Sequence, residues 1–316
     1  MQNNNKQSLL TAVIACYNDA KAIPIMHERL KKVFNKIGCN YEIIFVNDGS
    51  PDNTNEILED ICLKDQNVKA IIHSRNFSSQ NAFTSGMEHA SGDAVILLDG
   101  DLQDPPELIF DFFQKWKEGY DVVYGTRYKR EGNFFLSICY KIFYRLFNKL
   151  SYINIPYDAG DFSLMDKKVV NEINSIKEND RFIRGLRAWV GFSQIGINYV
   201  RQERMFGKTT NNLFKNIRWA KKGIFSFSYI PLELISYISY LIVAFSFFAI
   251  VFYFIYYFYN PGAPRGITTI ILIVLFLGGI QLLSVSFLSE YIGKILEETK
   301  KRPHYIIKKK INFDKK

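Results

Sequence analysis

Cysteine and histidine are both scarce in this chain, with four of each among 316 residues. No two cysteines form a C-x-x-C pair, and the histidines fall at no spacing typical of metal ligands, so we expect buried, reduced thiols. A secretory signal is lacking as well. The first apolar stretch, 9–17, is too short and has too little positive charge before it. We therefore expect the first domain to stay in the cytoplasm.

An even spread of positive charge is also lacking. Residues 1–200 hold 23 basic and 25 acidic side chains, whereas residues 201–316 hold 17 and 6. The same last third contains the two longest uncharged apolar runs, so the excess charge is typical of membrane flanks and not of a nucleic-acid surface. No nucleic-acid partner is expected. With 48% hydrophobic and 16% aromatic residues, the composition also excludes a disordered chain.

Short β-branched runs alternate with helical periods from residue 9 to residue 125. Strands are predicted at 9–16, 41–47, 68–74, 94–99 and 121–125. The segments between them carry apolar residues at i, i+3 and i+4, as over 25–37. Near-continuous apolar strands separated by helices indicate an α/β, Rossmann-like fold with a mostly parallel sheet. Ligands of such a sheet bind beyond the carboxyl ends of its strands.

Polar side chains follow the predicted strands directly. They are Tyr17 to Asp19 after the first strand, Asn47 to Ser50 after the second, Arg75 and Asn76 after the third, and Asp99 to Asp101 after the fourth. Hard oxygen ligands such as Asp99 and Asp101 suit Mg²⁺ or Mn²⁺ bound together with a diphosphate. An Asp-x-Asp pair is also common in turns that cap helices. Its place at a strand end, joined by Asp48, favours the functional interpretation.

Two long runs without a charge lie in the last third, 26 residues at 234–259 and 23 residues at 267–289. At about 1.5 Å per residue, either is long enough to cross about 30 Å of hydrocarbon. The short Pro- and Gly-rich break between them predicts a hairpin of two transmembrane helices. Basic residues flank both outer ends of the hairpin. The positive-inside rule therefore predicts that those ends, the first domain and both termini lie in the cytoplasm, with the hairpin in the inner or plasma membrane. A hairpin buried in a soluble domain is the less favoured alternative.

The stretch 134–153 is strongly aromatic, and Lys141, Arg145 and Lys149 recur in it at every fourth position. A basic stripe opposite apolar side chains fits a helix in the membrane interface, and a core helix with a solvated basic face fits equally well. The predicted organisation is a polar tail at 1–8, a cytoplasmic domain at 9–210, a juxtamembrane amphipathic segment at 211–233, the hairpin, and a basic cytoplasmic tail at 290–316.

Several motifs together carry a resemblance to a known family. They are Val46 to Asp52, Leu98 to Glu107, Gly160 to Met165, Glu290 to Lys294 and Thr299 to Pro303. Over about residues 9–310, and in the same order, the chain resembles the family-2 polyisoprenyl-phosphate glycosyltransferases. Within that family it is most similar to the bactoprenol glucosyltransferases, which are related to dolichyl-phosphate mannose synthase.

The resemblance implies a reaction and its partners. A GT-A domain with Mg²⁺ or Mn²⁺ would transfer one sugar from a nucleotide sugar to undecaprenyl or another polyprenyl phosphate, with inversion at the anomeric carbon. UDP-glucose is the expected donor, and N-acetylglucosamine, galactose and mannose are the alternative sugars. The product would serve the modification of a cell-surface glycan. A homo-oligomer, a tetramer by resemblance, is also implied.

The same resemblance implies roles for individual residues. Asp99, Asp101 and Gln103 would bind the metal and the donor diphosphate, and Tyr17, Asp19 and Asp48 would hold the base and ribose. Asp161 would be the catalytic carboxylate at the sugar, with Asp158 as its neighbour, and Asp101 would take part in catalysis through the metal. Arg127, then Lys141 and Arg145, would bind the acceptor phosphate, while Arg204 and Lys208 would close over the donor.

The sequence departs from the family pattern at three places. Ser163 stands where the family usually has arginine, and Asn47 replaces the first acid of an Asp-Asp-Gly-Ser motif. The Gly-x-Ser-Lys of the closing segment is replaced by Gly207-Lys208-Thr209. Donor closure and sugar choice are therefore the parts that the motifs determine least.

Two other functions are disfavoured. A processive polysaccharide synthase would carry Gln-x-x-Arg-Trp and more membrane spans, but here Arg187 stands two residues before Trp189. A non-catalytic membrane scaffold would not need intact acids at 99, 101 and 161.

Overall fold

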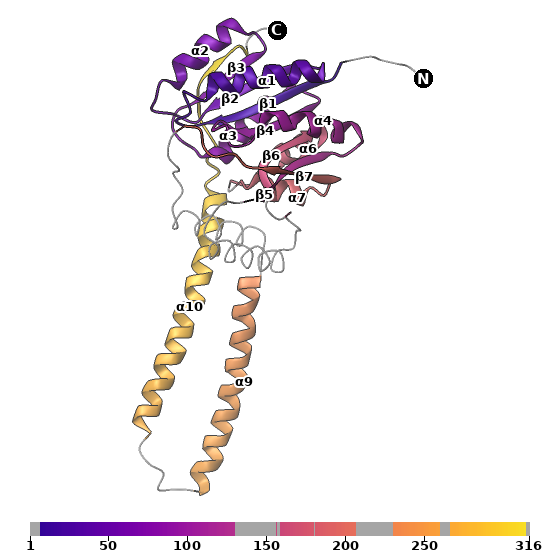
Figure 1. Ribbon diagram of the computed structural model, residues 1–316. Helices are drawn as coiled ribbons and strands as arrows, with labels where there is room; N and C mark the ends of the chain where they lie inside the picture. Colours follow the sequence, from indigo (N-terminus) through magenta and orange to yellow (C-terminus); the bar gives the residue numbers. More distant parts are fainter. Residues whose placement is uncertain are drawn as a thin grey trace. The chain divides into compact units, whose positions relative to one another are not determined.

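The computed structural model describes residues 7–129, 156, 159–179, 181–206, 230–259 and 266–313 (Figure 1). The chain divides into two units by its internal contacts. Met1–Arg145, Ile153–Asn216 and Arg302–Lys316 form the first, and Leu146–Tyr152 and Ile217–Lys301 form the second. The first unit holds a β-sheet with helices on its faces, and the second holds two long helices.

The elements of the first unit alternate along the chain up to the fifth strand. The strands are β1 (Leu9–Cys16), β2 (Asn40–Asn47), β3 (Val68–His73), β4 (Ala94–Asp99), β5 (Val122–Lys129), β6 (Ala159–Asp166), β7 (Gln194–Val200) and β8 (Ile307–Ile311). The helices are α1 (Ile23–Ile37), α2 (Thr54–Lys64), α3 (Ser79–His89), the 3-10 turn η1 (Pro106–Leu108), α4 (Ile109–Lys117), α6 (Lys167–Ser175) and α7 (Ile183–Trp189).

The described strands form one eight-stranded sheet in the order β7-β5-β6-β4-β1-β2-β3-β8. The neighbouring pairs among β4, β1, β2 and β3 are parallel, as is the pair of β5 with β7. β6 lies antiparallel between β4 and β5, and β8 is antiparallel to β3. The prediction of an α/β fold with a mostly parallel sheet is confirmed, with two antiparallel insertions that the pattern did not reveal.

Helices cover both faces of the sheet (Figure 1). The helices α1, α2 and α4 contact one another in one layer, while α3, α6 and α7 form the other. Because both faces are covered, β1 is buried from Leu10 to Cys16. Helix α1 ends at Gly38, whose φ of 72° allows its amide to donate to Phe34 O.

Two predictions about strands need correction. The predicted strand 121–125 continues as β5 to Lys129, so Arg127 lies inside a strand and not just after it. The segment 290–316 is more than a basic tail, because α10 continues to Thr299 and Ile307–Ile311 joins the sheet as β8. Three consecutive lysines occupy the middle of β8. The strand therefore lacks the alternation of apolar and polar residues by which a strand is predicted from sequence.

The second unit consists of α9 (Ile230–Tyr259) and α10 (Ile267–Thr299), which contact each other. Among the described residues, one helical segment is long and apolar enough to cross a membrane. It is Phe276–Thr299, 24 residues with a mean hydropathy of 1.2. The apolar part of the other helix, Ile235–Ala249, is shorter. The structure therefore supplies one candidate span where the sequence predicts two.

Candidate active site

Loops from three neighbouring strands meet at the carboxyl end of β1. The Gly100 amide donates to Ala15 O at 2.9 Å, and the Asp48 amide donates to Cys16 O at 3.0 Å. A Cβ on Gly100 would lie 3.0 Å from Cys16 Sγ and 3.2 Å from Asp19 Oδ2. Glycine therefore lets the Asp-x-Asp turn approach the first loop closely.

Carboxylates crowd one another at this edge of the sheet. Desolvation, together with the charges of Asp101 and Asp104, raises the pKa of Asp99 to about 8. Burial likewise raises the pKa of Asp19 to about 6, and the charge of Asp101 adds to that rise. A divalent cation would offset this repulsion and lower both pKa values.

The oxygen atoms of Asp99, Asp101 and Gln103 are of the type that Mg²⁺ and Mn²⁺ prefer. Within the described part of the chain, no three His, Cys, Asp or Glu side chains are grouped so that they could hold a metal by themselves. Mg²⁺ in proteins commonly takes one or two carboxylates together with substrate phosphates. The donor set therefore fits a cation that binds with a diphosphate.

The segment after β7 lies on the Asp-x-Asp turn. Gln103 Nε2 donates to Gln202 O at 3.3 Å, and the Gln202 amide donates to Gln103 O at 3.2 Å. Arg204 Nη2 forms an ion pair with Asp101 Oδ2 at 3.2 Å. The structure thus brings a residue of the predicted closing segment to a predicted metal ligand, although the two lie 103 positions apart.

Tyr17 and Asp19 form the loop after β1. The Tyr17 amide donates to Asp19 Oδ2 at 3.0 Å, and the Tyr17 ring is 39% exposed. Between them Asn18 has a φ of 60°, and its amide donates to Ser50 Oγ at 3.1 Å. The accessible Tyr17 ring lies on a fixed loop and is available to stack on a nucleotide base. The Asp19 carboxylate already accepts a hydrogen bond within this loop.

Asp48 is buried and bonded to the loop after β3. Its Oδ1 accepts from His73 Nδ1 at 2.9 Å and from the Phe77 amide at 2.8 Å. One carboxylate oxygen is therefore occupied by the protein, and only the other is available to a ribose.

Asp161 lies in β6 and is held by two side chains from distant parts of the chain. Its Oδ2 accepts from Gln80 Nε2 at 3.0 Å and pairs with Arg184 Nη2 at 3.1 Å. Burial alone would raise the pKa of Asp161, but the charges of Arg184, Arg187 and Arg127, with the hydrogen bond from Arg184, together lower it. Gln80 also accepts from the Ile183 amide at 2.8 Å, which fixes the start of α7 against the carboxylate. Asp161 is consequently ionised at neutral pH.

Arg127 joins β5 to the Asp-x-Asp turn. Its Nε donates to Tyr199 Oη at 3.3 Å, and its Nη2 lies 4.0 Å from Asp104 Oδ1. Tyr199 in turn donates to the buried Asp104. Burial alone would lower the pKa of Arg127, yet Asp104 and Tyr199 raise it, so the guanidinium stays charged. A Cβ on Gly160 would lie 2.9 Å from Arg127 Nη2, so the glycine leaves room for this side chain.

Three site residues were missed by the sequence analysis: Gln80, Arg184 and Arg187. Arg187 is fully buried, donates from Nη1 to Gly160 O at 3.4 Å and lies over the Tyr124 ring at 4.9 Å. Its Nε and Nη2 have no partner among the described residues. Burial lowers its pKa to about 10, while Asp161 acts in the opposite direction. In the sequence Arg187 is an ordinary helix residue two positions before Trp189, and no local motif marks it as part of the site.

Several predicted features lie outside the described residues. They are Asp158, Lys208, Lys141, Arg145, the interfacial helix 134–153 and most of the segment 211–233. Ser163, the departure from the family pattern, is fully buried in β6, and its hydroxyl donates to Asp161 O at 2.9 Å. At this site the arginine beside Asp161 comes from α7 instead.

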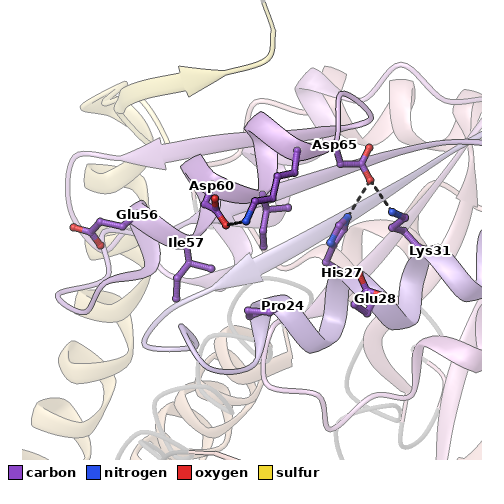
Figure 2. Close-up of a pocket in the computed structure, with 10 residues that line it drawn as sticks. Pro24, His27, Glu28, Lys31, Glu56, Ile57, Asp60 and Asp65 are labelled. Atoms are coloured by element: carbon purple, nitrogen blue, oxygen red, sulfur yellow. Dashed lines mark hydrogen bonds and ion pairs between the residues drawn. The ribbon is translucent and has the colours of Figure 1, made fainter.

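A separate surface pocket of about 530 Å³ lies between α1 and α2 (Figure 2). His27 Nε2 and Lys31 Nζ both approach Asp65 Oδ2 there, at 3.1 and 3.7 Å. The lining mixes acidic and basic groups that pair with one another, and it includes none of the predicted site residues.

The sequence profile of glycosyl transferase family 2 matches residues 11–173, which covers β1 to α6 and the carboxylates described above. The chain belongs to this family. The GT-A-like, mostly parallel sheet predicted from the sequence agrees with that assignment.

This glycosyltransferase has relatives that match it over nearly its whole length. It is 43% identical to the uncharacterized glycosyltransferase YkcC of Bacillus subtilis, with 96% of this chain and 94% of the relative covered. It is 38% identical to the bactoprenol glucosyl transferase of Shigella phage SfII, with 95% and 97% covered. A solved structure of glucosyl-3-phosphoglycerate synthase from Mycobacterium tuberculosis is similar at 15% identity and a TM-score of 0.46, with 70% and 78% covered.

Proposed function

We propose that this glycosyltransferase moves one glucose from UDP-glucose to undecaprenyl or a similar polyprenyl phosphate, with inversion at the anomeric carbon. The observation that carries the proposal is the 38% identity, over 95% of the chain, to relatives named bactoprenol glucosyl transferase. The geometry supports it, because a carboxylate cluster suited to a metal diphosphate lies at the same sheet edge as a group of arginines suited to a phosphate.

The donor side of the proposed site is built on β1, β2 and β4. Asp99, Asp101 and Gln103 would hold Mg²⁺ or Mn²⁺, and Tyr17, Asp19 and Asp48 would hold the nucleoside. A bound cation would neutralise part of the charge that develops on the departing diphosphate. Arg204, already at Asp101, would supply a further positive charge to the same leaving group, together with Lys208.

The acceptor side needs little base catalysis. A phosphate monoester is already anionic near neutral pH, so its oxygen can attack the anomeric carbon without a strong base. Asp161, ionised beside Arg184, would instead stabilise the positive charge that develops at that carbon. Arg127 would bind the acceptor phosphate and offset the repulsion between two anionic substrates, with Lys141 and Arg145 in support.

The topology is part of the proposal. Strand β8, after the apolar helices, pairs with β3, which precedes them. Two strands of one sheet lie on one side of a membrane, so the chain between them crosses an even number of times. With Phe276–Thr299 as one span, α9 supplies the other, and the sheet and both termini are cytoplasmic by the positive-inside rule. The homo-oligomer implied by the resemblance stays a prediction.

The experiment that tests the proposal compares donors directly. Membranes containing the protein are incubated with undecaprenyl phosphate and, in turn, radiolabelled UDP-glucose, UDP-N-acetylglucosamine, UDP-galactose and GDP-mannose. Label from UDP-glucose is expected in the organic phase, and only when the lipid phosphate is present. Label that stays in water with every donor would contradict the proposed reaction, and lipid label from another donor would change the sugar.

A further inference from the structure

The C-terminal strand β8 pairs with β3, in the half of the sheet whose loops carry the residues proposed to bind the nucleotide. Figure 1 shows β8, in yellow, beside β3 at the sheet edge. The register pairs Ala70 with Ile311 and His73 with Ile307, and the Ser74 amide donates to Ile306 O at 2.9 Å. Strand β8, which follows shortly after the end of α10, therefore forms the edge of the sheet next to the loop that follows β3.

Side chains fix this strand at both of its ends. Asn312 Nδ2 donates to Cys62 O at 2.7 Å and to Val68 O at 2.8 Å. At the other end, Tyr305 donates its hydroxyl proton to the Glu88 carboxylate of α3. These contacts place the Tyr305 ring on His73, with ring centroids 5.1 Å apart and an angle of 13° between the planes.

The His73 imidazole is held by one hydrogen bond and by two aromatic neighbours. Its side chain is fully buried, Nδ1 bonds to Asp48 Oδ1 at 2.9 Å, and Nε2 has no partner among the described residues. The Phe77 ring meets the imidazole edge-on at 5.8 Å. The Tyr305 ring covers the face of the imidazole and, with Phe77 at its edge, holds the ring plane in which Nδ1 meets Asp48.

From this chain of contacts we propose that Tyr305 and His73 are positioning residues for nucleotide binding. The C-terminal strand holds Tyr305, Tyr305 fixes the imidazole, and the imidazole holds Asp48 in the orientation that leaves its second oxygen to the ribose. The inference rests on the proposed function, in which Asp48 binds the nucleoside. It adds a contribution to the donor site from a residue 257 positions later in the sequence than Asp48.

The test separates binding from chemistry in the full-length protein. Tyr305→Ala should raise the KM for UDP-glucose and the Kd for UDP roughly three- to tenfold, the effect expected for losing one aromatic pair. The kcat and the KM for undecaprenyl phosphate should stay within about twofold. Tyr305→Phe keeps the ring and should retain near-normal nucleotide affinity.

Two further variants distinguish a positioning role of Tyr305 from a general weakening of the pairing between β8 and β3. Lys309→Ala removes the β8 ion pair with Glu59, 2.6 Å long, without touching His73, and should leave the KM unchanged. In a His73→Asn background, which can keep a hydrogen bond to Asp48 but not the stack, adding Tyr305→Ala should have no further effect on the Kd for UDP.

Two results would overturn the inference. One is an unchanged Kd for UDP in Tyr305→Ala; the other is an equal loss in Tyr305→Ala and Lys309→Ala with a lowered Tm. Failure of the proposed function looks different, because the wild-type protein would then transfer no sugar while the UDP measurement could still be made. Normal wild-type transfer with no effect of Tyr305→Ala would reject the inference alone.

Discussion

Arg204 Nη2 lies 3.2 Å from Asp101 Oδ2, so the segment after β7 places a guanidinium on the second carboxylate of the Asp-x-Asp turn. The pair is partly buried, and the charge of Arg204 also lowers the pKa of Asp19 against the stronger effect of burial. A metal diphosphate that binds to Asp101 must displace this guanidinium or share the carboxylate with it. In the proposed function, Arg204 would move from this carboxylate to the departing diphosphate.

Replacing Arg204 tests that role. Arg204→Gln should lower kcat/KM for UDP-glucose about tenfold or more, because a charge on the developing diphosphate is lost. Binding of Mn²⁺ without nucleotide should stay the same or become tighter, since a competing cation has gone. Lys168→Gln is a matched control that breaks the 2.5 Å ion pair with Asp121, where β5 begins, and should change neither value. If Arg204→Gln and Lys168→Gln changed kcat/KM by the same factor, Arg204 would have no specific role at the leaving group.

The need for a metal can be tested at Asp101. Asp101→Asn should remove most of the turnover, about 10²-fold or more, because a ligand of the diphosphate-bound cation loses its charge. EDTA should abolish wild-type activity, and added Mg²⁺ or Mn²⁺ should restore it. Steady-state rates of lipid labelling measure both effects. Full activity in the presence of chelator would show that the carboxylates serve another purpose.

The pairing of Arg184 with Asp161 predicts a pH effect. Arg184 makes the largest contribution among the arginines that lower the pKa of Asp161 against burial, so its removal should raise that pKa even though Arg187 and Arg127 stay. In Arg184→Gln the carboxylate is then protonated at a higher pH, and the acid limb of the kcat profile should move toward neutral pH. Arg184→Lys keeps the charge and should show a smaller displacement. A rate that falls by the same factor at every pH would contradict the electrostatic role.

Acceptor binding can be tested at Arg127. Arg127→Ala should weaken transfer to polyprenyl phosphate by roughly 10²-fold, the order expected for losing a charged contact of about 3 kcal/mol. UDP-glucose binding, measured by calorimetry, should change little, because Asp104 keeps Tyr199 and Arg201 as partners. Normal lipid kinetics with lost donor binding would assign Arg127 to the nucleotide side.

Glu42 provides a test of the fold. Its carboxylate accepts from Thr11 at 2.7 Å, Lys69 at 2.5 Å and Ser91 at 2.9 Å, which ties β2 to β1, β3 and the turn before β4. Burial alone would raise its pKa, but these hydrogen bonds lower it below 4.5. The stabilisation is therefore present above about pH 4.5 and is lost as the pH falls through the folded value.

The corresponding variant is Glu42→Gln, which should lower the unfolding free energy at pH 7 by about 2–3 kcal/mol. The difference in Tm from the wild type should shrink at pH 4. Glu107→Gln, which breaks a more exposed pair with Arg29, is the control and should cost less than about 1 kcal/mol. A Glu42→Gln penalty that does not depend on pH would mean that shape, and not charge, is what the site requires.

Local pattern predicted the first half of the fold well. Strands such as β1 and β4 are continuous apolar runs with polar ends, so their bounds and the Asp99–Asp101 turn at a strand end followed from the residues themselves. β6, β7 and β8 were not predicted. Only one position of β7 is buried, so that strand carries no continuous apolar run. β6 contains Asp161 and Ser163 among its buried positions, and β8 is Ile-Lys-Lys-Lys-Ile, so neither reads as a buried strand.

The missed site residues share one physical cause. Gln80 and Arg184 reach Asp161 from positions 81 and 23 residues away, and Tyr305 reaches His73 through a strand pairing that no local pattern encodes. Each looks like an ordinary helix or tail residue in the sequence. Only the topology, with β6 inserted beside β4 and β8 added beside β3, brings them to the site.

The chemical structure of the product distinguishes the proposed inverting transfer of one glucose from every alternative. Purified full-length protein is given UDP-α-glucose, undecaprenyl phosphate and Mn²⁺, and the lipid extract is examined by mass spectrometry and by NMR of the anomeric carbon. Undecaprenyl phosphate carrying a single β-linked glucose is expected, and it should be absent when Asp101→Asn replaces the wild type. An α-linked product, several glucose units on one lipid, or free glucose with unmodified lipid would contradict the proposed transfer.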